Sequence, residues 1–324
     1  MIKRFLEIHT RVFLLVITLA FPLLSCMSEQ SSQEPTLASQ PTASIAETTS
    51  PTPTPSASPM PFTNYGETLI DVTYCTPDNL PQSMDVYFPD AGEPWPALVY
   101  VHGGAWIRGD KAEAAMFARA MTDQGYLVVS LNYRLYPAGR YPAMIEDVKC
   151  AIRSLRANAR EYNLDPDRIG AVGVSAGGHL VALLGTSEAS AGMEVGEQLE
   201  QSSRVQAVVA MAPVTDLTRK FPNADIELMR QVGFGEDNIV QASPITHVTA
   251  DDPPFLLIHG DRDEVVPVEQ SQLLYERLVQ ENVPAQLVIV RNGRHSLTAP
   301  DGSATPTWGE INQIIQNFLA QHLK

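Results

Sequence analysis

The sequence is poor in cysteine and in positive charge, and each shortage excludes a class of protein. Its 324 residues include three cysteines, at positions 26, 75 and 150, which are too few for a disulfide scaffold, and no Cys-x-x-Cys pair offers a zinc site. Lysine and arginine number 22 against 37 aspartates and glutamates, a formal charge of -15. Because so negative a surface repels phosphate backbones, we expect no nucleic-acid partner. The hydrophobic content of 44% excludes a disordered chain.

Long hydrophobic runs are also missing, and the most extended apolar stretch lies near the N-terminus. Residues 12–24 follow three basic residues and are apolar except for Thr18 and Pro22. A run of this length is too short to cross a bilayer as a helix but suits the core of a signal peptide. It ends in Leu-Leu-Ser-Cys26, which resembles the lipobox of bacterial lipoproteins.

We therefore predict a signal peptide over residues 1–25, lipidation of Cys26, and an extracytoplasmic protein that is lipid-anchored to the bacterial cell envelope. The alternative is an ordinary secretory signal with an incidental cysteine, and hence a secreted protein. Residues 27–62 contain seven prolines and fourteen serines or threonines. This composition buries too little apolar surface to offset the entropy of ordering. We expect residues 26–62 to be a linker and residues 63–324 to form the folded domain.

The remaining residues alternate between short apolar runs and amphipathic segments. The runs at 69–74 and 84–88 have a period of two, as half-exposed strands do. Later runs are continuous and rich in branched residues, which is typical of strands buried on both faces of a parallel sheet. The pattern predicts one α/β domain with a mostly parallel central sheet and helices on both faces. The continuous runs are 97–101, 127–131, 169–174, 205–211, 255–258 and 287–290.

A glycine-flanked serine follows one of these runs directly. Gly173-Val174-Ser175-Ala176-Gly177 comes after the predicted strand and opens an apolar helical segment at Leu180. This context favours a nucleophile elbow, in which a sharp strand-to-helix turn exposes the serine hydroxyl. A tight glycine turn without chemistry is the alternative, and the flanking strand and helix favour a nucleophile at Ser175.

A second glycine-rich loop, His102-Gly103-Gly104-Ala105-Trp106, follows the run 97–101. Two consecutive glycines leave backbone N–H groups unshielded, so these groups can approach a developing oxyanion. We expect the N–H groups of Gly103, Gly104 and Ala176 to form an oxyanion hole, and His102 to shape the loop. Trp106 is a candidate wall of the acyl pocket, with a packed core aromatic as the alternative.

A serine nucleophile needs a base, and the base needs an orienting acid. Of the seven histidines, His295 lies in a glycine-bearing loop directly after the run 287–290. Loops at the carboxyl ends of parallel strands converge on one edge of a sheet, so we predict that His295 meets Ser175. Asp261 and Asp263 both follow the run 255–258, and either can orient the base; they can also be turn or cap carboxylates.

Taken together and in this order, the motifs resemble the α/β-hydrolase superfamily from about Thr68 to the C-terminus. Within it they are similar to bacterial esterases of the acetylxylan and feruloyl esterase-like and kynurenine-formamidase-like groups. In such enzymes the second aspartate of His-Gly-Asp-x-Asp is the triad acid, which implies Asp263. The sequence departs from the pattern at Ala105, where a third glycine is common, and at Arg294, where a small residue is common. The segments that carry the resemblance are 102–106, 132–135, 173–180 and 259–267.

The resemblance implies an α/β-hydrolase fold and a serine carboxylic-ester hydrolase that uses Ser175, His295 and Asp263 through an acyl-enzyme, without metal or organic cofactor. No long insert predicts a large lid, and residues 216–249 are the candidate for a small cap. Small esters or esterified polysaccharide are the expected substrates. The alternatives are a serine peptidase or amidase of the same fold and a catalytically silent surface binding protein. Cys75 and Cys150 form either a disulfide or two buried free thiols.

Overall fold

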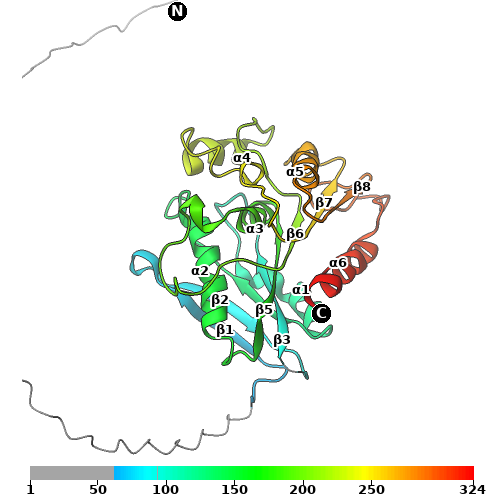
Figure 1. The fold of residues 1–324 in the computed structure, drawn as a ribbon. Coiled ribbons are helices and arrows are strands. Elements are labelled where there is room, and N and C mark those ends of the chain that lie inside the picture. The colour runs from blue at the N-terminus through cyan, green and yellow to red at the C-terminus, as the bar shows by residue number, and fades with distance from the viewer. Residues whose placement is uncertain (1–61, 93) are drawn as a thin grey trace, which may run out of the picture. The chain divides into compact units, whose positions relative to one another are not determined.

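The computed structural model describes residues 62–92 and 94–324 (Figure 1). The predicted signal peptide, the lipidation site at Cys26 and the linker up to residue 61 lie outside the described residues. Within the described part of the chain, no helix is both long enough and apolar enough to cross a membrane. The same residues contain no cluster of three or more His, Cys, Asp or Glu side chains that could hold a metal ion.

Eight strands form one sheet in the order β1-β2-β4-β3-β5-β6-β7-β8. The β1–β2 and β2–β4 pairs are antiparallel, and every other pair is parallel. Each predicted run overlaps one of these strands, although residue 88 lies beyond β2 and residues 205–206 precede β6. Strand β5 begins five residues before the expected Ile169, because Leu164 pairs with Trp95 across a bulge. The strands are β1 (Thr68–Cys75), β2 (Gln82–Tyr87), β3 (Trp95–Val101), β4 (Leu127–Leu131), β5 (Leu164–Val174), β6 (Ala207–Met211), β7 (Phe255–Gly260) and β8 (Ala285–Val290).

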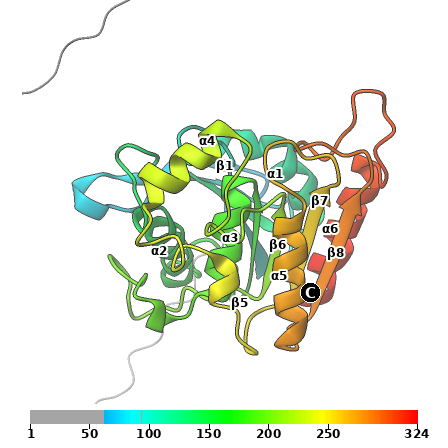
Figure 2. The same ribbon diagram turned by 90° about the horizontal axis from the view of Figure 1, so that it is seen from above.

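Helices cover both faces of the sheet, as the continuous apolar runs predict (Figures 1 and 2). Successive side chains of a strand point to opposite faces of the sheet, so a run without polar residues must be covered on both faces. Val99 belongs to the core beneath α2, α3 and α5, whereas its neighbour Leu98 belongs to the core beneath α1 and α6. The helices are α1 (Ala115–Thr122), α2 (Ala143–Ala157), α3 (Ala176–Thr186), α4 (Ala224–Met229), α5 (Glu269–Gln280) and α6 (Trp308–Leu323), with shorter turns η1 (Pro77–Asn79), η2 (Lys111–Ala114), η3 (Ala189–Ala191), η4 (Arg230–Phe234) and η5 (Pro244–Thr246).

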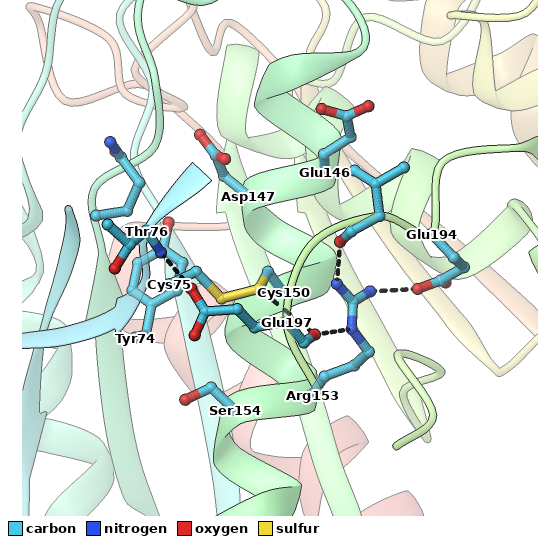
Figure 3. Close-up of a disulfide and its surroundings, with 12 residues drawn as sticks. Tyr74, Cys75, Thr76, Glu146, Asp147, Cys150, Arg153, Ser154, Glu194 and Glu197 are labelled. Atoms are coloured by element: carbon cyan, nitrogen blue, oxygen red, sulfur yellow. Dashed lines mark hydrogen bonds and ion pairs between the residues drawn. A yellow bond between two sulfur atoms is a disulfide. The ribbon is translucent and has the colours of Figure 1, made fainter. Parts of the chain in front are cut away.

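Of the two alternatives for Cys75 and Cys150, the structure shows the disulfide (Figure 3). It joins the last residue of β1 to the middle of α2, with a Cα–Cα distance of 6.4 Å, and both cysteines are buried. Glu197 reinforces the junction, because its side chain accepts the N–H of Thr76 at 2.7 Å and its carbonyl accepts the guanidinium of Arg153 at 3.0 Å. The edge strand, α2 and the loop at residue 197 are thus tied together.

Candidate active site

Ser175 occupies the turn between β5 and α3, with φ 56° and ψ -117°. Close backbone packing around this turn explains the flanking glycines. A Cβ on Gly177 would lie 2.0 Å from the carbonyl oxygen of Val101 on β3, and a Cβ on Gly173 would lie 2.4 Å from the carbonyl oxygen of Gly177. Only glycine fits at either position, and the resulting elbow directs Ser175 into a cleft at the carboxyl edge of the sheet.

Ser175, His295 and Asp263 come together from three different loops. The hydroxyl of Ser175 lies 2.9 Å from Nε2 of His295, and Nδ1 of His295 lies 2.7 Å from Oδ2 of Asp263. The side chain of Asp263 is 0% exposed, whereas Asp261 is exposed and makes no side-chain contact with His295. Of the two aspartates that the sequence offered as the orienting acid, Asp263 is the one that contacts His295.

The Asp263 carboxylate receives hydrogen bonds on both oxygens. Oδ1 accepts the N–H groups of Val265 at 2.8 Å and Val266 at 2.9 Å, and Oδ2 accepts from His295. Burial alone would raise the pKa of Asp263, but the hydrogen bonds from His259 and His295 outweigh it and hold this pKa well below its usual value. An ionised Asp263 keeps the proton of His295 on Nδ1, so Nε2 faces Ser175 as an acceptor.

Two of the three predicted oxyanion-hole residues line the same cleft. Gly103 and Gly104 line it beside Ser175, and Ala176 follows Ser175 at the start of α3. Among the described residues, none of the three N–H groups donates a backbone hydrogen bond in the turns and loops. Backbone N–H groups without a protein acceptor can donate to a ligand oxygen. The buried His102 holds the loop, because its Nδ1 lies 2.7 Å from the carbonyl oxygen of Gly103.

Trp106 does not line the cleft, which corrects its assignment as a substrate contact. It is 0% exposed, its indole N–H donates to Nδ1 of His179 at 3.2 Å, and its ring meets Phe234 edge-on at 4.9 Å. Burial lowers the pKa of His179 to about 4, which keeps this histidine neutral and able to accept the indole N–H. Trp106 thus packs the loop after β3 against α3 and η4, as the alternative of a packed core aromatic predicts.

The cleft has a volume of about 540 Å³ and a mixed lining. Residues of α4 form one side of the cleft. Asp225 of this helix forms an ion pair at 3.3 Å with Arg108, which lies in the loop after β3. Part of the predicted small cap, residues 216–249, therefore borders the site. Arg294, which precedes His295, also lines the cleft and is exposed. A cleft of this size accommodates a small ester or one end of a larger one.

Sequence reasoning missed two contacts around the site. His259 reaches Oδ2 of Asp263 at 3.2 Å, and the side chains of Arg108 and Asp225 meet although they are far apart in sequence. The position of His259, four residues before Asp263 at the end of a strand, was the available signal for the first contact. No local sequence pattern predicts the contact between Arg108 and Asp225, because these residues are far apart in sequence and meet only in the folded chain.

Comparison with known proteins assigns the chain to a family. The BD-FAE family model matches residues 84–278. Esterase LipC of Mycobacterium tuberculosis is 38% identical over 245 residues, which cover 71% of this chain and 59% of LipC. The probable carboxylic ester hydrolase LipM of the same organism is 35% identical, with 70% and 54% coverage. The chain thus matches between half and three fifths of the length of these relatives.

Solved structures support the fold. A truncated carbohydrate esterase from gut microbiota superposes with a TM-score of 0.67 at 28% identity and covers 79% of this chain and 98% of its own. The esterase Est2 of the Planctomycetes species Thermogutta terrifontis superposes with a TM-score of 0.68 at 26% identity, with 78% and 91% coverage. The chain has the α/β-hydrolase fold, as the sequence predicts.

Proposed function

This chain belongs to the BD-FAE family, and we propose that it is a serine carboxylic-ester hydrolase with Ser175 as the nucleophile, His295 as the base and Asp263 as the orienting acid. The observation that carries the proposal is the continuous hydrogen-bonded path from Ser175 through His295 to Asp263, at 2.9 Å and 2.7 Å. The names of LipC, LipM and Est2 support the same reaction class.

In the proposed reaction, Nε2 of His295 accepts the hydroxyl proton of Ser175 as Oγ attacks the ester carbonyl. Asp263 stabilises the imidazolium that forms. The unpaired N–H groups of Gly103, Gly104 and Ala176 stabilise the oxyanion of the tetrahedral intermediate, and loss of one such donor typically lowers kcat by about a hundredfold or more.

The remaining steps reverse the proton transfer. His295 protonates the departing alkoxide, which leaves the acyl group bonded to Oγ of Ser175. Water then enters, His295 removes one of its protons, and collapse of the second intermediate releases the acid and restores the serine hydroxyl. Every proton in this cycle passes through one imidazole, so no metal or organic cofactor is needed.

We propose an ester carried on a polysaccharide, or a small ester, as the substrate. An open cleft of about 540 Å³ and the similarity to a carbohydrate esterase from gut microbiota support this class. The lipobox-like sequence before Cys26 supports an envelope-anchored location, in which the linker would hold the domain near such substrates.

The test is hydrolysis of nitrophenyl esters from acetyl to decanoyl, and of methyl ferulate, by the full chain. Ser175→Ala should abolish turnover, whereas Ser303→Ala, an exposed serine that contacts Asp301, should retain it. The chain-length profile then measures the acyl pocket. A folded protein without turnover on any ester would contradict the proposal and favour a peptidase or a silent binding protein.

The proposed lipid anchor has its own test. The chain should incorporate labelled fatty acid, and Cys26→Ala should abolish this incorporation.

A further inference from the structure

A second histidine, His259, reaches the carboxylate of Asp263. His259 lies in β7 and is 0% exposed. Its Nε2 lies 2.9 Å from the carbonyl oxygen of Val266 and 3.2 Å from Oδ2 of Asp263. Its Nδ1 lies 2.7 Å from the hydroxyl of Ser271 on α5, which is also fully buried. The steps of ester hydrolysis described above use neither His259 nor Ser271.

The partners of His259 determine which ring nitrogen carries the proton. A backbone carbonyl and an ionised carboxylate are both acceptors, so the nitrogen that faces them, Nε2, must carry hydrogen. In the neutral ring Nδ1 is then an acceptor, and the Ser271 hydroxyl beside it is the matching donor. The Nε2–H donates to the carbonyl of Val266 and also faces Oδ2 of Asp263 at 3.2 Å, and Ser271 fixes the tautomer that places hydrogen on Nε2.

We propose that His259 is a positioning residue that acts through Asp263. This inference rests on the proposed function, because it assigns a role within the same site. The N–H groups of Val265 and Val266 hold Oδ1, His295 donates to Oδ2, and Nε2 of His259 lies 3.2 Å from the same oxygen. His259 adds a second polar hydrogen beside Oδ2, which restrains the carboxylate further and keeps this oxygen directed at Nδ1 of His295.

The same nitrogen also stabilises the loop that surrounds the carboxylate. Val266 donates its N–H to Oδ1 of Asp263, and its carbonyl accepts the Nε2–H of His259. Loss of His259 would therefore release one donor to Oδ2 and loosen one of the two donors to Oδ1. The hydrogen-bonded series from Ser271 to His259, Asp263, His295 and Ser175 places an α5 hydroxyl at one end and the nucleophile at the other.

Two substitutions of His259 separate positioning from general stability. His259→Leu removes the donor to Asp263, and His259→Gln keeps an N–H donor in its place together with an oxygen that can accept from Ser271. We expect His259→Leu to lower kcat for nitrophenyl acetate about ten- to a hundredfold with little change in KM, and His259→Gln to recover most of this loss. His322→Leu in α6 is the matched control, because this histidine lies outside the cleft lining.

A double-variant cycle shows whether the effect passes through Asp263. If it does, His259→Leu should change kcat less than twofold in an Asp263→Ala background, because the carboxylate that it positions is absent. An equal loss in both backgrounds would overturn the proposal and leave His259 a structural core residue. A His259→Leu protein that is folded and as active as the native chain would overturn it as well.

Proton NMR gives a readout that does not need turnover. The Nδ1–H of His295 bonded to Asp263 should resonate far downfield, and His259→Leu should move this signal while His259→Gln restores it. An unchanged signal in His259→Leu refutes the positioning role. Should the native chain hydrolyse no ester, the proposed function fails, and this signal still decides whether His259 positions Asp263.

Discussion

Removal of the Cys75–Cys150 disulfide should destabilise the domain strongly without changing its chemistry. The perturbation is the double variant Cys75→Ala, Cys150→Ala, which deletes the bridge and leaves no free thiol at either position. Neither cysteine lines the cleft that holds Ser175. We therefore expect kcat and KM on a nitrophenyl ester to stay within about twofold of the native values at 25 °C.

The magnitude follows from the length of chain that the bridge closes. The two cysteines are 75 residues apart, and the chain-entropy relation gives about 4.5 kcal/mol for a loop of that size at 25 °C. Side-chain contacts at the junction, such as that of Glu197 with Thr76, remain in the double variant and add no loss. For a domain of this size, about 4.5 kcal/mol corresponds to a fall in Tm of roughly 9–18 °C.

The assay is urea-induced unfolding of the native and double-variant chains, followed by circular dichroism and by tryptophan fluorescence. The native protein should lose the same increment when unfolding is repeated with a reductant, whereas the variant should not respond to reductant. Thiol titration of the denatured, unreduced native chain should detect no more than one thiol, that of Cys26.

A free-energy difference below about 1 kcal/mol between the two proteins would refute the loop-entropy reasoning. Reactive thiols at Cys75 and Cys150 in the unreduced chain would refute the bridge itself. A loss of activity with intact folding would show instead that the bridge positions the site.

Three further changes test other parts of the structure. Gly104→Ala should lower kcat about a hundredfold or more, measured on nitrophenyl acetate, because φ at Gly104 is 105° and a Cβ would lie 2.0 Å from the carbonyl oxygen of Arg108. Trp106→Phe should cost about 1–2 kcal/mol in urea unfolding, since Nδ1 of His179 loses its donor, and an altered KM would contradict the packing role. Burial raises the pKa of Asp252 to about 6, so its ionisation opposes folding above pH 6 and this penalty vanishes as the pH falls toward 4. The free energy of unfolding of Asp252→Asn relative to the native chain should therefore be larger at pH 8 than at pH 4, measured by urea unfolding at both pH values. An equal difference at both pH values would be inconsistent with this sign.

Local pattern was sufficient to predict the sheet and the position of the nucleophile. Each of the eight strands overlaps a predicted run, because strands buried on both faces are apolar throughout and half-exposed strands such as β1 alternate with a period of two. The elbow at Ser175 was equally visible, since the contacts that exclude side chains at Gly173 and Gly177 are made by backbone only a few residues or one strand away. The carboxyl ends of parallel strands share an edge, which brought His295 into the prediction.

The identity of the side chains that meet at that edge depended on the tertiary structure. The residues alone allowed Asp261 or Asp263, and only the path of the loop after β7 buries Asp263 against His295. From the sequence, Trp106 was a candidate for the wall of the acyl pocket. In the structure its indole N–H donates to the buried His179 on α3, so the side chain belongs to the core. The disulfide, too, joins a strand and a helix 75 residues apart. The sequence determines which segments are apolar. Contacts between polar groups of distant segments form only in the folded chain, because the energy of a hydrogen bond or ion pair depends on the distance between its atoms.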